Sequence, residues 1–295
     1  MITSRLSGGL GNQMFQYALG RVLAQLNNSP LCLDLSYYYQ KHTQDTPRRY
    51  ELNIFPNIKN QDLPIRTKSQ FSTINMIKLF LNHHLKFNSK AYPSNWIKES
   101  GHQFNPGILS LKGDYILDGY WQSEKYFKKF RESILTDFSF PSKTSKKNNE
   151  VINYLKTYTT ISTHVRRGDY ISNQKSADCH GVCSTQYYQK AIDLIRKQVY
   201  KPIFLIFSDD INWCKKNLPV PHKSIFVNHN NGKNSFEDMR LMSLCNHNII
   251  ANSSFSWWGA WLNKNTEKII ITPKKWFNDP KVIIKDINPS TWIKI

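Results

Sequence analysis

The sequence has few cysteines, no long apolar run and no targeting segment, and each absence excludes a class of protein. Its five cysteines are an odd number in a chain of 295 residues, which argues against the disulfide framework of a secreted protein. No run approaches the roughly 20 apolar residues of a membrane-spanning helix. Met1 leads directly into a strand-like stretch, without the charged and apolar regions of a signal peptide. We therefore expect a soluble, cytoplasmic protein that is at most peripheral at the inner face of a membrane.

Acidic residues are also scarce. The chain has 40 Lys and Arg against 21 Asp and Glu, a formal net charge of +19. This balance favours an anionic partner, which could be a nucleic acid, an anionic membrane or a phosphorylated substrate, and a codon bias toward lysine and asparagine is the alternative. The basic residues are scattered and accompany no zinc finger or RNP motif, so nucleic-acid binding is a remote alternative.

Signatures of a bound metal are nearly absent. No D-x-D occurs, and neither H-E-x-x-H nor G-x-S-x-G is present. One isolated cluster, "CHGVC" (Cys179 to Cys183, with His180), offers metal-ligating side chains but lacks a second ligand pair. We therefore predict neither a metal nor a cofactor.

The pattern that is present is an alternation of strands and helices. "ITSRLS", a glycine loop, the helical pattern of residues 13–26 and "PLCLDL" form a βαβ start, and a second regular alternation runs from "TTISTHV" to "KIIIT". This predicts an α/β protein with two Rossmann-like domains, residues 1–150 and 151–295, facing a cleft. The polar stretch Pro141–Glu150 is the expected linker. Ser36–Lys112 is weakly patterned, with one helix candidate at Ile74–Leu85.

Three loops follow predicted strand ends, where ligands bind in open α/β sheets. The first is "GGLGN", whose Gly9 and Gly11 could let the backbone approach an anion. Met14 stands where a dinucleotide fingerprint needs its third glycine, and the Gly-Lys-Ser/Thr of a P-loop is missing. A plain tight turn explains this loop equally well.

The second loop is "HVRRGDY", His164 to Tyr170. Arg166 and Arg167 suit bidentate phosphate binding, Asp169 could orient an arginine, and His164 could orient a ligand. The alternative is a surface salt-bridge cluster. Such a density of charge at the end of a strand favours a functional site.

The third loop, "ANSSFSWWGAW", places Ser253 and Ser254 where a helix N-cap belongs, so their hydroxyl groups and free N–H groups could receive phosphate oxygens. An ordinary cap is the alternative, and the tryptophans are expected in the core. Arginines and helix N-termini without a metal site predict a phosphate-bearing ligand. A nucleotide-sugar transferase fits this pattern, because its departing diphosphate must be stabilised.

Several motifs in this order resemble glycosyltransferase family 11, the α-1,2-fucosyltransferases. They are "GGLGNQMFQYALGRVLA", "HVRRGDY", "FSDDINWC" and "FEDMRLMSLCNHNIIANSSFSWWGAWL", and the resemblance extends from Leu6 to about Trp276. It implies a bacterial form with a GT-B-like fold and inverting, metal-independent transfer of fucose from GDP-fucose to O2 of a terminal β-galactoside. We expect a role in surface polysaccharide or O-antigen synthesis.

The resemblance also implies roles for single residues. Arg166 matches the arginine on the donor β-phosphate and Arg167 its supporting neighbour, while Asn12 matches an asparagine near the scissile bond. Asp238 matches an acid that pairs with guanine. The loop residues that match the surroundings of the phosphates and ribose are Ser253, Ser254 and Phe255.

The general base and the acceptor stay open at this stage. Asp169, Asp118 and Glu124 are the candidate bases, the latter two on the acceptor side. The acceptor site is expected within Ser36–Lys112, and the galactose-terminated acceptor could be carried on a pyrophosphate lipid at an anionic membrane. The alternatives are a fucosyltransferase of another linkage, an enzyme for another GDP-sugar, and a GDP-sugar-binding module without turnover.

Overall fold

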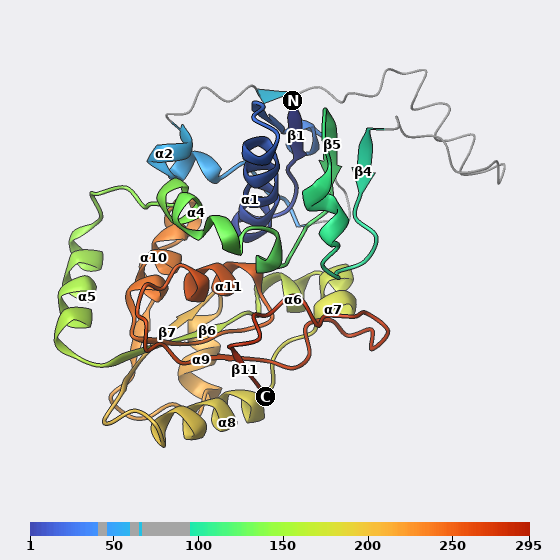
Figure 1. Ribbon diagram of the computed structural model, residues 1–295. Helices are drawn as coiled ribbons and strands as arrows, with labels where there is room; N and C mark the ends of the chain where they lie inside the picture. Colours follow the sequence, from blue (N-terminus) through green and yellow to red (C-terminus); the bar gives the residue numbers. More distant parts are fainter. Residues whose placement is uncertain (41–45, 60–64, 67–94) are drawn as a thin grey trace.

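The computed structural model describes residues 1–40, 46–59, 65–66 and 95–295. They form two α/β units, each built on a parallel sheet. Figure 1 shows the N-terminal unit, blue to green, above the C-terminal unit, yellow to red. The helix candidate at 74–85 and most of the segment expected to hold the acceptor site lie outside the described residues.

The N-terminal unit has a five-stranded sheet in the order β3-β2-β1-β5-β4. Its strands are β1 (Ile2–Arg5), β2 (Leu31–Asp34), β3 (Ile65–Arg66), β4 (Trp96–Lys98) and β5 (Tyr115–Asp118). Its helices are α1 (Leu10–Leu26), α2 (Pro56–Lys59) and α4 (Arg131–Asp137). Thirteen of the seventeen residues of α1 are buried, because the helix packs between its own sheet and the C-terminal unit.

The C-terminal unit has a six-stranded sheet in the order β11-β10-β9-β6-β7-β8, which is the strand order of a dinucleotide-binding Rossmann fold. Its strands are β6 (Thr160–Val165), β7 (Ile203–Ser208), β8 (Ile225–Val227), β9 (His247–Ile249), β10 (Ile270–Thr272) and β11 (Ile293–Lys294). Its helices are α5 (Lys146–Thr157), α6 (Gly168–Ser172), α7 (Gln174–His180), α8 (Thr185–Arg196), α9 (Ile211–Asn217), α10 (Phe236–Leu244) and α11 (Ser254–Trp261). The two-unit Rossmann-like fold predicted from the alternation is confirmed.

One aromatic core joins the two units. Trp257 and Trp258 of α11 are fully buried, as predicted, and both rings pack against Phe15 of α1, with centroid separations of 4.5 and 5.0 Å. Phe127 stacks on Trp258 at 5.2 Å. Aromatic pairs at such distances add to the burial energy, so α1 and α11 hold the units together.

The expected linker is wrong in its second half. Residues 146–150 begin α5, which Ser145 caps by accepting a hydrogen bond from the N–H of Asn148, so a boundary at 150 would divide a helix. The pattern also missed α6, α7 and β11, each seven residues or shorter. Helical periodicity is weak in such short segments.

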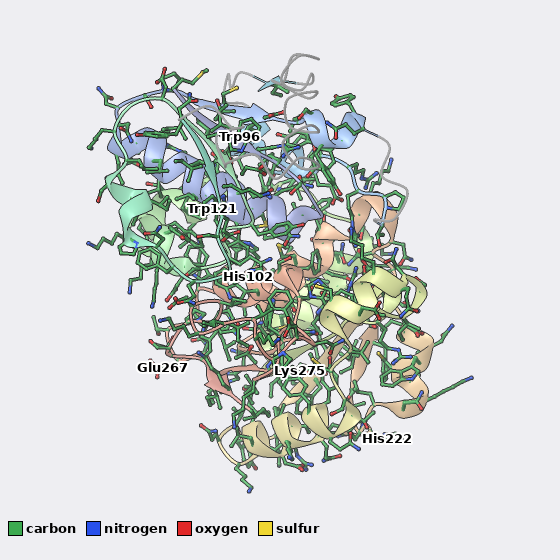
Figure 2. The ribbon with its side chains drawn as sticks, turned by 90° about the vertical axis from the view of Figure 1, so that its right-hand side faces the viewer. Trp96, His102, Trp121, His222, Glu267 and Lys275 are labelled. Atoms are coloured by element: carbon green, nitrogen blue, oxygen red, sulfur yellow. The ribbon has the colours of Figure 1, made fainter. Side chains whose placement is uncertain are left out.

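The C-terminal segment crosses back to the N-terminal unit. The buried Asp286 binds the ammonium of Lys125 at 2.5 Å and the N–H of Phe104 at 3.0 Å. His102, at the boundary of the units in Figure 2, stacks on Phe277 at 4.6 Å. No helix in the part of the chain that the structure describes has the length and apolarity of a membrane span.

Candidate functional site

The three predicted loops meet where the two sheets present their carboxyl ends. In the C-terminal unit the strand order reverses between β6 and β9, which lead into "HVRRGDY" and "ANSSFSWW". In the N-terminal unit β1 and β5 lie side by side, and β1 leads into "GGLGN". A reversal of strand order leaves a crevice for a ligand between the diverging loops. Segments far apart in the sequence are thereby brought together.

Arg166 lies at the centre of this arrangement, held between two carboxylates. Its guanidinium pairs with Asp169 at 2.5 Å and with Asp209, at the end of β7, at 2.7 Å. Tyr170 lies under it, with the guanidinium carbon 5.5 Å from the ring centroid. Burial alone would lower the pKa of Arg166, but Asp209 and Asp169 raise it above its usual value. The side chain is thus a fixed, fully charged fork.

Arg167 faces a different environment from Arg166. Its guanidinium stacks on Trp213 at 3.8 Å and pairs with Asp210 at 3.3 Å, both from the start of α9. Its backbone N–H donates to Asp209 at 2.9 Å. Arg167 therefore anchors the loop on the next strand end, and the donor-binding role expected for it as the supporting neighbour of Arg166 stays a prediction.

His164 is a buried, uncharged histidine near Arg166. Burial lowers its pKa to about 4, and the attraction of Asp209 only partly offsets the repulsion of Arg166 and the burial. Its ring lies 5.9 Å from that of Phe255, and its Nδ1 has no hydrogen-bond partner among the described residues. A neutral imidazole here can orient a neighbour or ligand but adds no charge.

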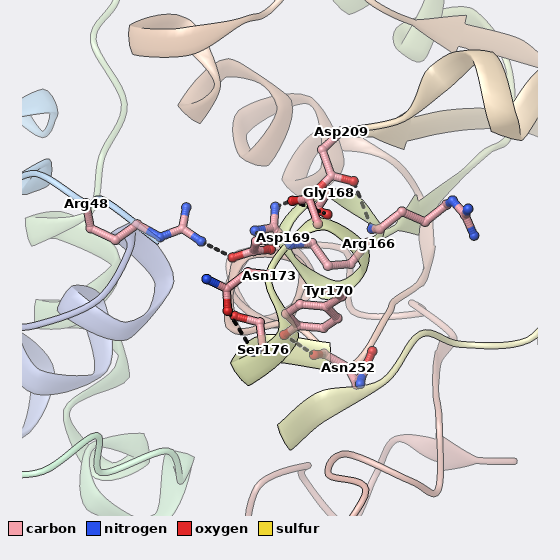
Figure 3. A network of polar contacts seen from close by, with 11 residues as sticks. Arg48, Arg166, Gly168, Asp169, Tyr170, Asn173, Ser176, Asp209 and Asn252 are labelled. Carbon is pink, nitrogen blue, oxygen red and sulfur yellow. Dashed lines mark hydrogen bonds and ion pairs between the residues drawn. The ribbon is translucent and has the colours of Figure 1, made fainter. Parts of the chain in front are cut away.

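Asp169 binds two arginines at once. One carboxylate oxygen accepts from Arg166 and the other from Arg48, which reaches across from the N-terminal unit (Figure 3). With both oxygens in ion pairs, Asp169 is a positioning group. This geometry disfavours it as the acceptor of a substrate proton, one of the roles that the sequence left open.

Gly11 lies where the N-termini of α1 and α11 meet. A Cβ at Gly11 would lie 2.5 Å from the carbonyl carbon of Ser254 and 2.7 Å from the nitrogen of Phe255, so only glycine fits. The indole of Trp258 donates to the carbonyl of Gly11 at 3.0 Å. A Cβ at Gly9, by contrast, would make only ordinary contacts with the Arg48 side chain, the nearest at 3.8 Å. Gly11 therefore positions two helix N-termini, each favourable to an anion.

Ser253 is the N-cap residue of α11, but its side chain makes no capping hydrogen bond. It is buried, and Ser254 and Phe255 beside it are partly exposed. Since the hydroxyl group does not cap the helix, it and the first N–H groups are available to phosphate oxygens as far as the described residues show, and the phosphate site stays a prediction.

Asn12 follows Gly11 and is held by the neighbouring strand end. Its side-chain oxygen accepts from the amide of Gln122, in the loop after β5, at 2.9 Å. This bond leaves the Asn12 amide N–H₂ pointing toward Gly8, where an added Cβ would be 2.7 Å away. Gln122 is a positioning residue that no sequence motif indicated.

Asp238, on α10, is a strongly perturbed carboxyl group. Burial raises its pKa to about 7, and a hydrogen bond from Asn230 at 2.8 Å opposes that shift only in part. Asn148 of α5 binds Asn230 in turn and fixes its orientation. A buried carboxyl group whose pKa lies near 7, and with which no cation among the described residues pairs, is typical of a ligand-binding position.

The two acceptor-side candidates from the sequence are occupied by structural contacts. Asp118 accepts from Arg5 at 3.1 Å and from the indole of Trp96 at 3.3 Å. Glu124 accepts from the indole of Trp261 at 3.2 Å, within the junction of the units. Neither contact indicates a free base.

Glu99, which no sequence motif indicated, lies directly after β4. Its carboxylate accepts from the backbone N–H groups of Tyr120 and Trp121 at 2.7 and 3.0 Å, in the loop that carries Gln122. Burial raises its pKa, against these two hydrogen bonds. No cation pairs with it among the described residues. Its segment lacks any periodic pattern, so only the fold could reveal it.

The "CHGVC" cluster has structural roles. His180 stacks on Tyr170 at 4.8 Å, and the thiol of Cys183 donates to Asn252 at 3.4 Å. Over the described ranges, no group of three or more His, Cys, Asp or Glu side chains is arranged to hold a metal ion.

Comparison with known proteins places these features in a family. The sequence model of "Glycosyl transferase family 11" matches residues 1–295. The chain is 37% identical to the O-antigen biosynthesis glycosyltransferase WbnK of Escherichia coli, over 93% of this chain and 94% of that protein. It is 35% identical to the α-1,2-colitosyltransferase of Escherichia coli, over 100% of this chain and 99% of that protein.

Among solved structures, the fold is similar to that of NodZ α-1,6-fucosyltransferase soaked with GDP-fucose. The TM-score is 0.50 at 16% identity, over 88% of this chain and 91% of that chain. At this identity the likeness concerns the fold alone, and it agrees with the GT-B-like architecture of two Rossmann-like units.

Proposed function

Because the chain belongs to glycosyl transferase family 11, we propose that it is an inverting α-1,2-fucosyltransferase that moves fucose from GDP-fucose to O2 of a terminal β-galactoside. One observation carries the proposal: Arg166 is fixed as a charged fork beside two converging helix N-termini. That arrangement suits the diphosphate of a nucleotide sugar. In this proposal the C-terminal unit binds the donor and the N-terminal unit faces the acceptor.

The chemistry would be a single displacement. The acceptor O2 attacks C1 of fucose, and the bond from C1 to the β-phosphate oxygen breaks as GDP leaves with its electron pair. Arg166 stabilises the charge that develops on the β-phosphate, with the N–H groups of α11 beside it. Asn12, whose side chain Gln122 holds, would donate to the oxygen of the bond that breaks.

Asp238 would recognise the base of the nucleotide. An ionised carboxylate accepts from N1–H and the N2 amine of guanine, and no other common base offers that pair of donors. Asn230 donates to one of its oxygens, and each carboxylate oxygen can accept a further hydrogen bond, so both oxygens can receive a donor from guanine. This supports GDP over other nucleoside diphosphates.

Glu99 would take the proton of the acceptor hydroxyl. It lies at the carboxyl end of the N-terminal sheet, beside the loop of Gln122, and its raised pKa makes it a better base than an ordinary carboxylate. Asp169, Asp118 and Glu124 are already engaged by arginine or tryptophan side chains.

Colitose is a second candidate for the transferred sugar. The relative named as an α-1,2-colitosyltransferase matches this chain over its full length. Colitose differs from fucose by lacking the 3-hydroxyl group, so the two donors share the diphosphate and base contacts described above. A site that binds O3 by a hydrogen bond should reject the deoxy sugar strongly.

The acceptor would be a growing surface polysaccharide, and the relative WbnK supports this through its name. A lipid pyrophosphate carrier at an anionic membrane would suit the net charge of +19. Co-sedimentation with vesicles should then increase with their anionic lipid content. If binding does not depend on the anionic lipid content of the vesicles, the proposed membrane contact is wrong.

One assay tests the function directly. The protein is incubated with GDP-fucose or GDP-colitose and a panel of β-galactosides, with and without chelator, and the product linkage is determined by NMR. We expect an α-1,2 linkage and equal rates with chelator. If the protein transfers a sugar from neither donor, the proposal is refuted. A preference for GDP-colitose would select the second candidate.

A further inference from the structure

Arg48 is a charged residue that none of the motifs above includes. It belongs to the N-terminal unit, yet its guanidinium pairs with Asp169 of the C-terminal unit (Figure 3). Its side chain passes over the glycine loop, and a Cβ at Gly9 would lie 3.8 Å from its Cδ and Nε atoms. Arg48 thus lies over the N-terminus of α1 and beside Arg166.

The backbone that carries Arg48 is fixed to α1. The buried amide of Gln13 donates to the carbonyl of Arg49 at 2.8 Å and accepts from the N–H of Glu51 at 2.8 Å. The same amide also donates to the carbonyl of Gly8 at 3.0 Å. One buried side chain therefore ties the segment of Arg48 to the glycine loop, which holds the guanidinium in place before any ligand arrives.

Arg48 changes the net charge of the cluster around Arg166. Arg166 lies between Asp169 and Asp209, so the three together carry one net negative charge, which would repel a diphosphate. The ion pair with Arg48 brings the cluster to neutrality. Arg167 does not help, because Asp210 offsets its charge. Among the described residues, the guanidinium of Arg48 is paired through one terminal nitrogen, and its side chain is about a third exposed, so its other N–H groups can reach a ligand.

We propose that Arg48 is the second diphosphate-binding arginine of the donor site, supplied by the N-terminal unit and directed at the β-phosphate. This inference rests on the proposed use of a GDP-sugar. With Arg166 on one side and Arg48 on the other, the β-phosphate is bound from both units. The donor site therefore includes side chains from both units and lies at the junction between them.

Binding of GDP and GMP to Arg48→Ala tests this role, because only GDP has a β-phosphate. Isothermal titration calorimetry should show a loss of GDP affinity of about 10-fold or more, the usual range for a charge-assisted hydrogen bond, with GMP affinity unchanged. Arg48→Lys should recover only part of the loss, because a point charge lacks the planar fork.

Arg49→Ala is the matched control, since Arg49 lies in the same segment, is exposed, and among the described residues forms an ion pair with Glu51 alone, at 3.6 Å. It should bind both nucleotides like the wild type. If Arg48→Ala binds GDP as tightly as the wild type, or weakens GDP and GMP equally, Arg48 is only a contact between units and the inference is wrong. If the wild-type protein itself does not bind GDP, the proposed function fails instead.

Discussion

The loops after β1 and β6 occupy equivalent positions in the two units but contribute to the site in different ways. The loop after β6 carries Arg166, Arg167 and Asp169, and every charge in it has a partner of opposite sign. The loop after β1 carries no charge between Leu6 and Asn12 and acts through shape, because Gly11 admits the backbone of α11. The C-terminal unit therefore supplies the charged side chains of the site, and the N-terminal unit supplies the glycine that lets two backbones approach closely.

This division indicates how each loop should respond to mutation. A change in the charged loop that keeps its charge, such as arginine to lysine, should impair transfer while the fold survives, because it leaves no ion of this mostly buried cluster unpaired. A change at Gly11 should first destabilise the junction of the units. The predictions below test this contrast, beginning with the largest expected effect.

Arg166→Lys should reduce kcat by about 10²–10³-fold, because an ammonium cannot bridge Asp169, Asp209 and a phosphate as a planar fork does. Steady-state kinetics with GDP-fucose and a β-galactoside measure this loss. The control is Arg167→Lys, which should cost less because that side chain faces Trp213. If Arg166→Lys kept more than about a tenth of the wild-type kcat, the two loops would not differ as we argue.

Glu99→Gln should reduce kcat/KM by about 10²-fold at neutral pH, since the amide cannot accept the hydroxyl proton. In the wild type the base must be ionised, so activity should fall as pH drops through the raised pKa of Glu99. The variant should lose this acid limb. If the variant is slower at every pH but keeps the limb, Glu99 only supports the 120–121 backbone and another group is the base.

Gly11→Ala should lower the free energy of unfolding by about 1–3 kcal/mol, the usual cost of overpacking, because the new Cβ would overlap the Ser254 carbonyl. Urea unfolding followed by tryptophan fluorescence reports on the junction, where Trp257 and Trp258 are buried. Gly9→Ala is the control, with its nearest neighbour 3.8 Å away, and should cost less than about 1 kcal/mol. Equal losses would show that packing does not distinguish the two glycines.

How far the sequence predicted these features depends on whether local pattern or tertiary contact creates them. In α8, Tyr188, Ala191, Ile192 and Ile195 recur at helical spacing and form the buried face, and Ser184 caps that helix, so local pattern alone specifies this element. Strand-end positions also located the three loops. However, Arg48 meets Asp169 across 121 positions of the chain, and nothing local specifies that contact. The sequence did not indicate Glu99 and Gln122 either, because their contacts also join distant parts of the chain.

The smallest expected effect concerns Asp238, which extends the contrast of charge and shape to the base of the nucleotide. Burial raises its pKa to about 7, so the free protein holds it mostly protonated at pH 6 and mostly ionised at pH 8. If guanine donates to the ionised form, GDP affinity should weaken as pH falls through 7. Asp238→Asn should reduce GDP affinity about 10-fold at pH 8 and much less at pH 6. The phosphates of GDP titrate in the same way whichever protein is present, so comparing the two proteins by calorimetry at both pH values isolates the effect of the carboxylate. If the ratio of wild-type to variant GDP affinity is the same at pH 6 and pH 8, Asp238 does not recognise the base.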